Sequence, residues 1–373
     1  MDIKTQIKRA IAARVPVLLM GDTGIGKTAQ IAQLAAELDA HLETVLASIR
    51  GPEDFGGLPL QDGQGGVTLA PPAWARRLAE KCAGGKLGIL FLDEVTSTPP
   101  ATQGALLRVV HERVVGELAL PASVVVIAAG NPDDVAAGGW DLGAALDLRF
   151  EQLIFPCPSP DAWAAWMLGQ ESIHPKARAL AAAFVRARPA LLDELGAARD
   201  RKARAAVLAR KPRAFGCPRK HEHAARLIAA CIEAGDALPD ALPLIAGAIG
   251  EPAAIEYCAW LRDADLPDPE ALLADPGKFA PDMRRPDVTF AILASVAEAA
   301  STRGSRSERD YAARWASAVP IFDRGLEAGK ECVLLPARRW AAADRRPKGA
   351  LPPAVVAFIG KIKGVVTAAG LMG

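Results

Sequence analysis

The sequence has few aromatic residues, almost no net charge and no long apolar run, and each property excludes a class of protein. Phe, Trp and Tyr together make up only 5% of the 373 residues. The 44 Lys and Arg residues balance 43 Asp and Glu, and the formal net charge of +1 argues against a strongly basic nucleic-acid binder. No apolar run reaches the ~18 residues that a membrane span needs, and Lys361 and Lys363 interrupt the nearest candidate, residues 351–373.

The sequence also shows no sign of export or of a cysteine framework. Residues 1–22 contain no apolar segment followed by a small-residue cleavage site. No two cysteines form a C-x-x-C pair, which disfavours a zinc finger or a set of disulfides. The six cysteines are Cys82, Cys157, Cys217, Cys231, Cys258 and Cys332. We therefore expect a cytoplasmic protein whose thiols are reduced.

The pattern of the first 156 residues is typical of an α/β domain. Hydrophobic residues make up 51% of the chain, enough for a substantial core. Short apolar runs alternate with stretches of helical periodicity, and this alternation predicts a parallel sheet covered on both faces. We predict a five-stranded parallel sheet with strands at residues 15–20, 41–49, 87–92, 123–129 and 150–155.

The remainder of the chain shows only helical patterns. We predict a helical lid domain over residues 157–240 and a helical extension of unknown role over residues 241–373. Residues 199–220 hold nine Lys and Arg against one acid. Phe215 is the only aromatic residue among these cations, so the stretch lacks regular aromatic interleaving, and we interpret it as a solvated helical face rather than a nucleic-acid site.

A glycine-rich motif follows the first predicted strand. Residues 21–28 read GDTGIGKT and fit G-x-x-x-x-G-K-[ST], the phosphate-binding loop, between a strand and a helix. Glycines let backbone N–H groups approach phosphate oxygens, and the helix amino terminus adds partial positive charge. Lys27 would contact the β- and γ-phosphates of ATP, and Thr28 would offer a hydroxyl to Mg²⁺. The predicted nucleotide-binding residues are Gly21, Asp22, Thr23, Gly24, Ile25, Gly26, Lys27, Thr28 and Asp93.

Two further positions lie where predicted strands end. The apolar run 87–92 leads into Asp93 and Glu94, at the edge of the sheet where ligands bind in open α/β folds. Asp93 would hold Mg²⁺, and Glu94 would orient the water that attacks the γ-phosphate. Asn131 follows the run 123–129, and its amide could bind the γ-phosphate or the attacking water. An ordinary Asn-Pro turn explains Asn131 equally well.

These motifs, with residues 98–113, 128–132 and 146–150, resemble the AAA+ ATPases. The resemblance is strongest to the MoxR branch, which is close to chelatase-type and dynein-related ATPases, and it covers about residues 1–240. It implies an AAA+ core followed by a helical lid. It also implies that Asn131 is the sensor-1 residue of the site.

The resemblance assigns roles to two arginines. Arg149 falls on the arginine finger, which reaches the nucleotide of a neighbouring subunit, although this chain reads Asp-Leu-Arg-Phe where many members read Leu-Asp-Arg-Phe. Arg108 and Arg113 are alternatives. Arg219, in Phe-Gly-Cys-Pro-Arg, resembles the sensor-2 arginine of the lid, and Arg213 is a second candidate for that role.

Residues 51–66 occupy the position of an insert that marks this branch. In a ring, that insert faces the pore and touches the client or an adaptor. Phe55 and Leu58 are candidate contact residues, and packing of the loop onto its own domain is an equally good interpretation.

The function implied by the resemblance is that of a MoxR-like chaperone or remodelling ATPase. It would assemble as a homo-oligomeric ring, expected to be a hexamer, bind ATP and Mg²⁺ and act on a protein client. MoxR-type ATPases often act with a von Willebrand A-type protein, and the absence of a D-x-S-x-S motif implies that this partner is a separate chain. Two alternatives stay open: an assembly scaffold that binds ATP with little turnover, and a motor stimulated by nucleic acid.

Overall fold

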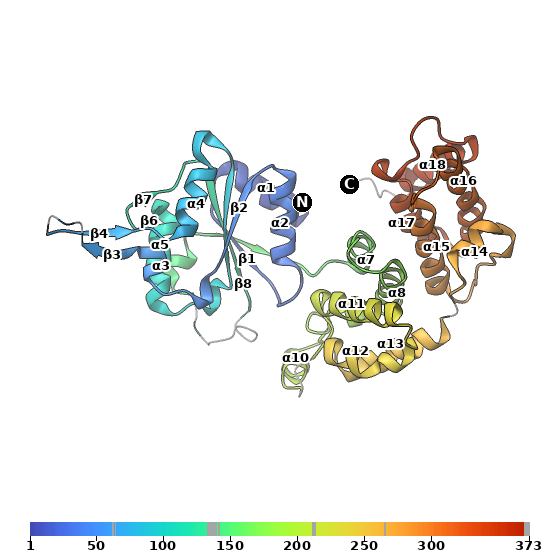
Figure 1. The fold of residues 1–373 in the computed structure, drawn as a ribbon. Helices are drawn as coiled ribbons and strands as arrows, with labels where there is room; N and C mark the ends of the chain where they lie inside the picture. Colours follow the sequence, from blue (N-terminus) through green and yellow to red (C-terminus); the bar gives the residue numbers. More distant parts are fainter. Residues whose placement is uncertain are drawn as a thin grey trace. The chain divides into compact units, whose positions relative to one another are not determined.

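The computed structural model describes residues 1–61, 63, 65–132, 140, 142–210, 214–264 and 266–368. The chain divides into two compact units, Met1–Cys157 and Pro158–Gly373 (Figure 1). All of the described strands belong to the first unit. No described helix combines the length and the apolar character needed to cross a membrane.

A parallel five-stranded sheet forms the centre of the first unit, as predicted, with the strand order β2-β5-β8-β1-β9. Its strands are β1 (Val17–Met20), β2 (His41–Leu46), β5 (Gly88–Asp93), β8 (Val124–Gly130) and β9 (Glu151–Ile154). The three inner strands are buried along almost their whole length, which explains why they read as unbroken apolar runs.

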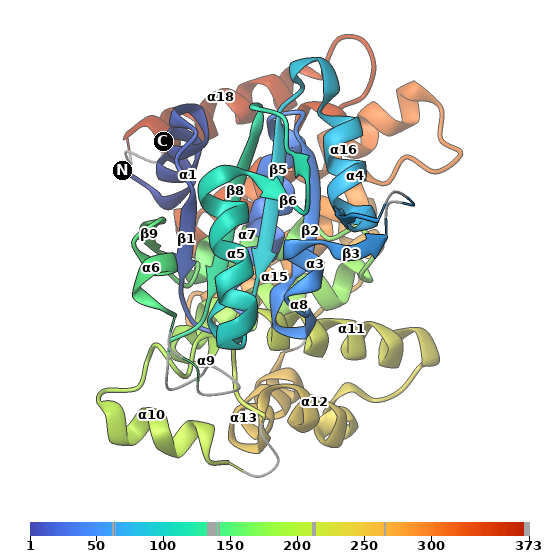
Figure 2. The same cartoon turned by 90° about the vertical axis from the view of Figure 1, so that its left-hand side faces the viewer.

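Helices cover both faces of this sheet (Figure 1, Figure 2). One face carries α1 (Ile3–Ala13) and α2 (Lys27–Glu37), and the other carries α3 (Glu53–Gly56), α4 (Ala73–Lys81) and α5 (Pro100–Glu112). Successive strand residues point to opposite faces. Val125 therefore packs in the same core as Leu34 of α2, whereas Val126 packs with Leu106 of α5.

Residues 51–72, which include the insert position 51–66, contain regular structure. The helix α3 is followed by a hairpin of β3 (Leu58–Gln61) and β4 (Val67–Ala70). The hairpin projects from the first unit (Figure 1). Its residues are mostly exposed, so no apolar alternation marks the strands in the sequence.

Several short elements complete the described part of the first unit. A two-stranded antiparallel ribbon is formed by β6 (Val114–Val115) and β7 (Leu118–Ala119). The 3₁₀ turns η1 (Ala47–Ile49) and η3 (Val95–Ser97) follow β2 and β5, and η2 (Ala83–Gly85) follows α4. The short helix α6 (Ala144–Asp147) precedes β9.

The second unit is built from helices, many of which start with proline at a position where its missing N–H costs nothing. The helices are α7 (Pro160–Leu168), α8 (Pro175–Ala187), α9 (Pro189–Leu192), α10 (Arg201–Leu208), α11 (Pro218–Ala234), α12 (Leu242–Ile249), α13 (Glu251–Asp263), α14 (Pro269–Ala274), α15 (Pro286–Ser301), α16 (Glu308–Gly325), α17 (Lys330–Trp340) and α18 (Pro353–Ala368). The 3₁₀ turns are η4 (Leu238–Ala241), η5 (Pro276–Lys278) and η6 (Ala343–Arg345).

A buried ion-pair network joins the early and late helices of this unit. Arg178 of α8 donates through Nη2 to Glu298 of α15 at 2.6 Å, and Arg345 of η6 contacts the same carboxylate. Arg345 and Arg339 of α17 each also lie 3.2 Å from Glu171. The network therefore links residues on both sides of position 240, where we predict the boundary between lid and extension.

Candidate functional site

The glycine-rich loop joins β1 to α2 at the carboxyl edge of the sheet. Gly24 and Gly26 have φ angles of 76° and 102°, a region that residues with a Cβ rarely adopt. At Gly21, a Cβ would lie 2.6 Å from the carbonyl oxygen of Phe155. The turn therefore needs glycine at these three positions, two for conformation and one for space.

Lys27 lies inside this loop and contacts a residue that is distant in sequence. Its Nζ donates to the carbonyl oxygens of Gly21 at 2.6 Å and Asp22 at 2.9 Å. It also donates to Oδ1 of Asn131, at the end of β8, at 2.9 Å. The side chain is buried, so these oxygens replace water around the ammonium group.

The two predicted Mg²⁺ ligands are in direct contact. Thr28 donates through Oγ1 to Oδ2 of Asp93 at 2.8 Å, which brings the start of α2 to the end of β5. A hydroxyl and a carboxylate are oxygen donors of the kind that Mg²⁺ prefers. The donor set therefore suits a magnesium ion held beside the phosphates of a nucleotide.

Glu94 lies directly after Asp93 in a left-handed conformation with φ of 57°. Its Oε2 accepts a hydrogen bond from Oγ of Ser48 at 2.7 Å. Ser48 belongs to η1, which directly follows β2. The strand β2 pairs with β5 in a register that sets Leu46 opposite Asp93. Sequence analysis missed Ser48, because only this register shows that it meets Glu94.

Thr96 is a second residue that sequence analysis missed. Its Oγ1 accepts a hydrogen bond from the backbone N–H of Asn131 at 3.0 Å and lies 3.3 Å from the carbonyl oxygen of the same residue. Gly130 makes this approach possible, since a Cβ there would lie 2.6 Å from Cγ2 of Thr96. Thr96 thus fixes the backbone of Asn131 from the segment after β5.

Arg149 lies at the opposite edge of the sheet from the glycine-rich loop. It lies two residues before the start of β9, which pairs with β1 so that Glu151 is opposite Val17, whereas Gly21 follows the other end of β1. A four-residue strand spans roughly 13 Å. Arg149 is exposed, and its guanidinium makes no hydrogen bond or ion pair with another described residue.

The alternative arginines are held within the first unit. Arg108 bonds to Glu112 and to the carbonyl oxygen of Gly116, each at 3.0 Å. Arg113 donates to the carbonyl oxygen of Arg14 at 3.2 Å. Both side chains therefore have partners in their own domain, unlike Arg149.

The sensor-2 candidates belong to the second unit. Arg219 is exposed in the first turn of α11, directly after Pro218. Arg213 lies outside the described residues. The geometry of the first unit therefore brings together the predicted residues of the loop, Asp93, Glu94 and Asn131, while Arg219 stays a prediction.

One of the two candidate contact residues of the insert is buried. Phe55 lies in the core against Trp74, with ring centroids 6.0 Å apart, so our interpretation of Phe55 as an exposed contact is wrong. An aromatic residue in a Gly- and Pro-rich stretch can anchor that stretch as well as mark a surface. Leu58 is 53% exposed, and Leu60 and Val67 of the same hairpin are 47% and 62% exposed.

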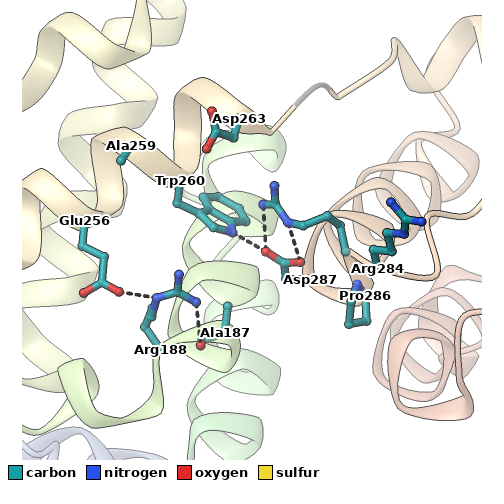
Figure 3. A pocket seen from close by; sticks show the side chains of 10 residues that line it. Ala187, Arg188, Glu256, Ala259, Trp260, Asp263, Arg284, Pro286 and Asp287 are labelled. Carbon is teal, nitrogen blue, oxygen red and sulfur yellow. Dashed lines mark hydrogen bonds and ion pairs between the residues drawn. The ribbon is translucent and has the colours of Figure 1, made fainter.

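The second unit contains a cavity of about 530 Å³ between α8, α13 and the start of α15 (Figure 3). Four of its charged residues form two ion pairs. Arg188 contacts Glu256, and Asp287 accepts from Arg285 at 3.0 Å and from the indole of Trp260. We interpret the cavity as a solvated gap bordered by ion pairs that hold these helices together.

Comparison with known proteins finds a family match within the first unit. Residues 16–150 match the AAA domain (dynein-related subfamily). This finding confirms the AAA+ part of the resemblance seen in the sequence. The five-stranded sheet and the glycine-rich loop described above lie almost entirely within these residues.

Individual relatives are similar over parts of their length. The chain is 31% identical over 177 residues to the Nif-specific regulatory protein of Rhodobacter capsulatus, a match that covers 43% of this chain and 28% of that protein. NtrX from Brucella abortus in complex with ADP is 17% identical, with 69% of this chain and 67% of that chain covered and a TM-score of 0.33. RuvB from Thermotoga maritima, a Holliday junction branch migration motor, is 14% identical, with coverage of 79% and 80% and a TM-score of 0.34.

Proposed function

We propose that this protein is an ATP-hydrolysing AAA+ ATPase of MoxR type that works as a ring, expected to be a hexamer. The observation that carries the proposal is the convergence of Lys27, Thr28, Asp93, Glu94 and Asn131 at one edge of the sheet. These residues come from three chain segments, and each has the chemistry that a step of phosphoryl transfer to water requires.

ATP would be held by the loop after β1. The N–H groups at the start of α2 and the ammonium of Lys27 would face the β- and γ-phosphates, in place of the two carbonyl oxygens that Lys27 now contacts. Thr28 and Asp93 would hold Mg²⁺, which neutralises charge on the phosphates when bound. Asn131 would donate from its amide nitrogen to the γ-phosphate while its oxygen stays on Lys27.

Glu94 would orient and deprotonate the attacking water. Its carboxylate is held by Ser48, so the hydroxyl of Ser48 sets the direction from which Glu94 reaches the water. Arg149 would act on the next subunit, since it lies away from its own loop and is exposed. Such an arginine stabilises charge in the transition state and contributes a factor of ~10³–10⁵ in rate in other arginine-finger systems. Arg219 would sense the nucleotide from the lid.

Two substitutions test the ATPase assignment. Lys27→Ala should abolish ATP binding, and Glu94→Gln should keep ATP binding while turnover is lost. Phosphate release and binding of a fluorescent ATP analogue measure both properties. Unchanged ATP affinity in Lys27→Ala would refute the role of the loop, and full turnover in Glu94→Gln would remove Glu94 from the mechanism.

The biological role proposed is remodelling of a protein client in the cytoplasm, together with a separate von Willebrand A-type partner. The exposed apolar side chains of the β3–β4 hairpin, Leu58, Leu60 and Val67, support a protein contact there. Affinity capture with Glu94→Gln in ATP, compared with the same variant carrying Leu58→Ser and Leu60→Ser, tests this role. A client should be retained only by the variant with the intact hairpin.

Two other functions predict different results in the same assays. An ATP-gated scaffold would assemble in ATP without measurable phosphate release, alone or with its partner. A nucleic-acid motor would hydrolyse ATP faster when DNA or RNA is added, with a steep dependence on salt.

A further inference from the structure

Gln103 of α5 contacts two backbone segments at once with its side-chain amide. Nε2 donates to the carbonyl oxygen of Thr98 at 2.9 Å, and Oε1 accepts from the backbone N–H of Gly143 at 2.7 Å. Gln103 is 6% exposed and therefore makes both bonds in the core. A buried amide is costly unless it is paired in this way, so both contacts fix its position firmly.

The first of these segments follows the acidic residues of the site. The N–H of Thr98 donates to the carbonyl oxygen of Val95 at 3.2 Å, and Oγ1 of Thr98 lies 3.5 Å from the carbonyl oxygen of Glu94. Thr98 is completely buried. Gln103 is therefore anchored to a tight turn whose first residue is the proposed catalytic glutamate.

The second segment leads to the proposed arginine finger. The carbonyl oxygen of Gly143 accepts from the N–H groups of Leu146 at 2.9 Å and Asp147 at 3.0 Å, which starts α6. The N–H of Arg149 donates in turn to the carbonyl oxygen of Leu146 at 3.1 Å. A continuous series of backbone hydrogen bonds thus runs from Gly143 to Arg149. The contact with Gln103 therefore fixes the position at which this short helix begins.

We propose that Gln103 is a positioning residue for Arg149, which fixes segment 143–149 relative to the catalytic segment 94–98. The inference rests on the proposed function, since it takes Arg149 to act on the neighbouring subunit. Leu146 and Phe150 also anchor the segment in the core. Apolar packing fixes how deeply segment 143–149 sits in the core more than it fixes the orientation of the segment. The hydrogen bond between Gly143 and the side-chain amide of Gln103 is directional, and it orients the segment that ends at Arg149, six residues after Gly143.

The substitution Gln103→Leu removes both hydrogen bonds at similar volume. It should lower ATP turnover by up to about 100-fold, the cost of a displacement near 1 Å at a reacting centre, and leave the affinity for ATP within twofold. Gln33→Leu, on the exposed face of α2, is the matched control and should keep normal turnover. Normal turnover in Gln103→Leu would overturn the proposal.

A second pair of variants tests the same contact from its other side. Gly143 has φ of −59°, which proline also adopts, so Gly143→Pro removes the N–H without forcing a new φ. Gly143→Ala keeps the N–H. We expect Gly143→Pro to reproduce the loss of Gln103→Leu, Gly143→Ala to be active, and the double variant Gln103→Leu, Gly143→Pro to lose little more. Equal activity of the Pro and Ala variants would contradict the proposal even if Gln103→Leu does not fold.

Mixed assemblies separate a positioning role from a general structural one. Glu94→Gln subunits cannot hydrolyse ATP but still offer a normal Arg149 to their neighbours. Mixing them in equal amounts with inactive Gln103→Leu subunits should restore turnover at about a quarter of the sites, above either protein alone. No recovery would mean that Gln103→Leu damages its own site, and the proposal would fail.

The same mixture made with Arg149→Ala distinguishes this proposal from the proposed function. Arg149→Ala with Glu94→Gln should also recover turnover, since the intact arginines complete the intact sites. If it does not, action of Arg149 between subunits is refuted. If it does and the Gln103→Leu mixture stays inactive, only the role of Gln103 is refuted.

Discussion

Nζ of Lys27 and Oδ1 of Asn131 lie 2.9 Å apart, although 104 residues separate them in the sequence. The contact joins the start of α2, which follows β1, to the residue after β8. The ends of β1 and β8 adjoin because the two strands pair, with Met20 opposite Gly130. An amide oxygen is a neutral partner for the ammonium. It orients Lys27 without cancelling the charge that a triphosphate would need.

Asn131→Asp should therefore weaken ATP binding. A carboxylate in place of the amide would pair with Lys27 and repel the γ-phosphate, and we expect the Kd for ATP to rise at least tenfold, about 1.4 kcal/mol. Asn131→Ala removes the contact without adding charge and should raise Kd less. Titration with a fluorescent ATP analogue measures both, and similar affinities for the two variants would contradict the electrostatic argument.

Thr96→Val should affect the position of Asn131 without changing its chemistry. The variant keeps the shape of the side chain but leaves the part-buried N–H of Asn131 without its partner, at a cost of up to about 1–3 kcal/mol. We expect a lower free energy of unfolding and reduced turnover. Thr96→Ser keeps the hydroxyl and should retain most turnover, whereas equal losses in both variants would point to packing as the cause.

His221 should make stability depend on pH. Burial among Trp163 and Phe184 lowers the pKa of His221 from 6.5 to about 4, and its Nε2 lies 2.7 Å from the carbonyl oxygen of Leu191. Above pH 6.5 the imidazole is neutral in both the folded and the unfolded chain. Between pH 6.5 and 4 only the unfolded chain takes up the proton, so this group makes stability fall as the pH falls, by about 1.4 kcal/mol per unit at most.

Urea unfolding of wild type and His221→Gln at pH 7 and pH 5 measures this contribution. The decrease in unfolding free energy from pH 7 to pH 5 should be smaller in His221→Gln than in wild type. His223→Gln, exposed on the same helix, should keep the wild-type decrease. The prediction fails if His221→Gln and wild type lose the same amount.

Glu298→Gln should destabilise the second unit strongly. The substitution leaves the buried guanidinium of Arg178 without a charged partner, and removing one member of a buried ion pair costs about 3–5 kcal/mol. Glu222→Gln breaks the more exposed pair with Arg226 and should cost less than about 1 kcal/mol. Urea unfolding monitored by tryptophan fluorescence compares the two, and equal effects would show that the network adds little.

The sequence predicted those parts of the site that depend on local pattern. Lys27 and Thr28 belong to one continuous motif, and Asp93 and Glu94 follow an unbroken apolar run. Residues that are neighbours in the sequence are enough to specify the conformation of the loop and the positions of the strands, and the structure agrees with those predictions.

The contacts that sequence analysis missed depend on pairing between distant segments. Ser48 meets Glu94 through the register of β2 on β5, and Thr96 meets Asn131 because β5 adjoins β8. Serine and threonine are too common after strands for either to stand out without that register. The prediction that Phe55 is an exposed contact residue was wrong for a related reason, since only the fold shows that Trp74 lies beside it.

The ion pairs among Arg178, Glu298 and Arg345 have a mechanical consequence. Because these residues lie on both sides of position 240, the ion pairs link the helices before and after it, and we expect these helices to move as one rigid body. A small rotation of α8 would then carry α15 and α17 with it, because Glu298 of α15 pairs with both Arg178 of α8 and Arg339 of α17.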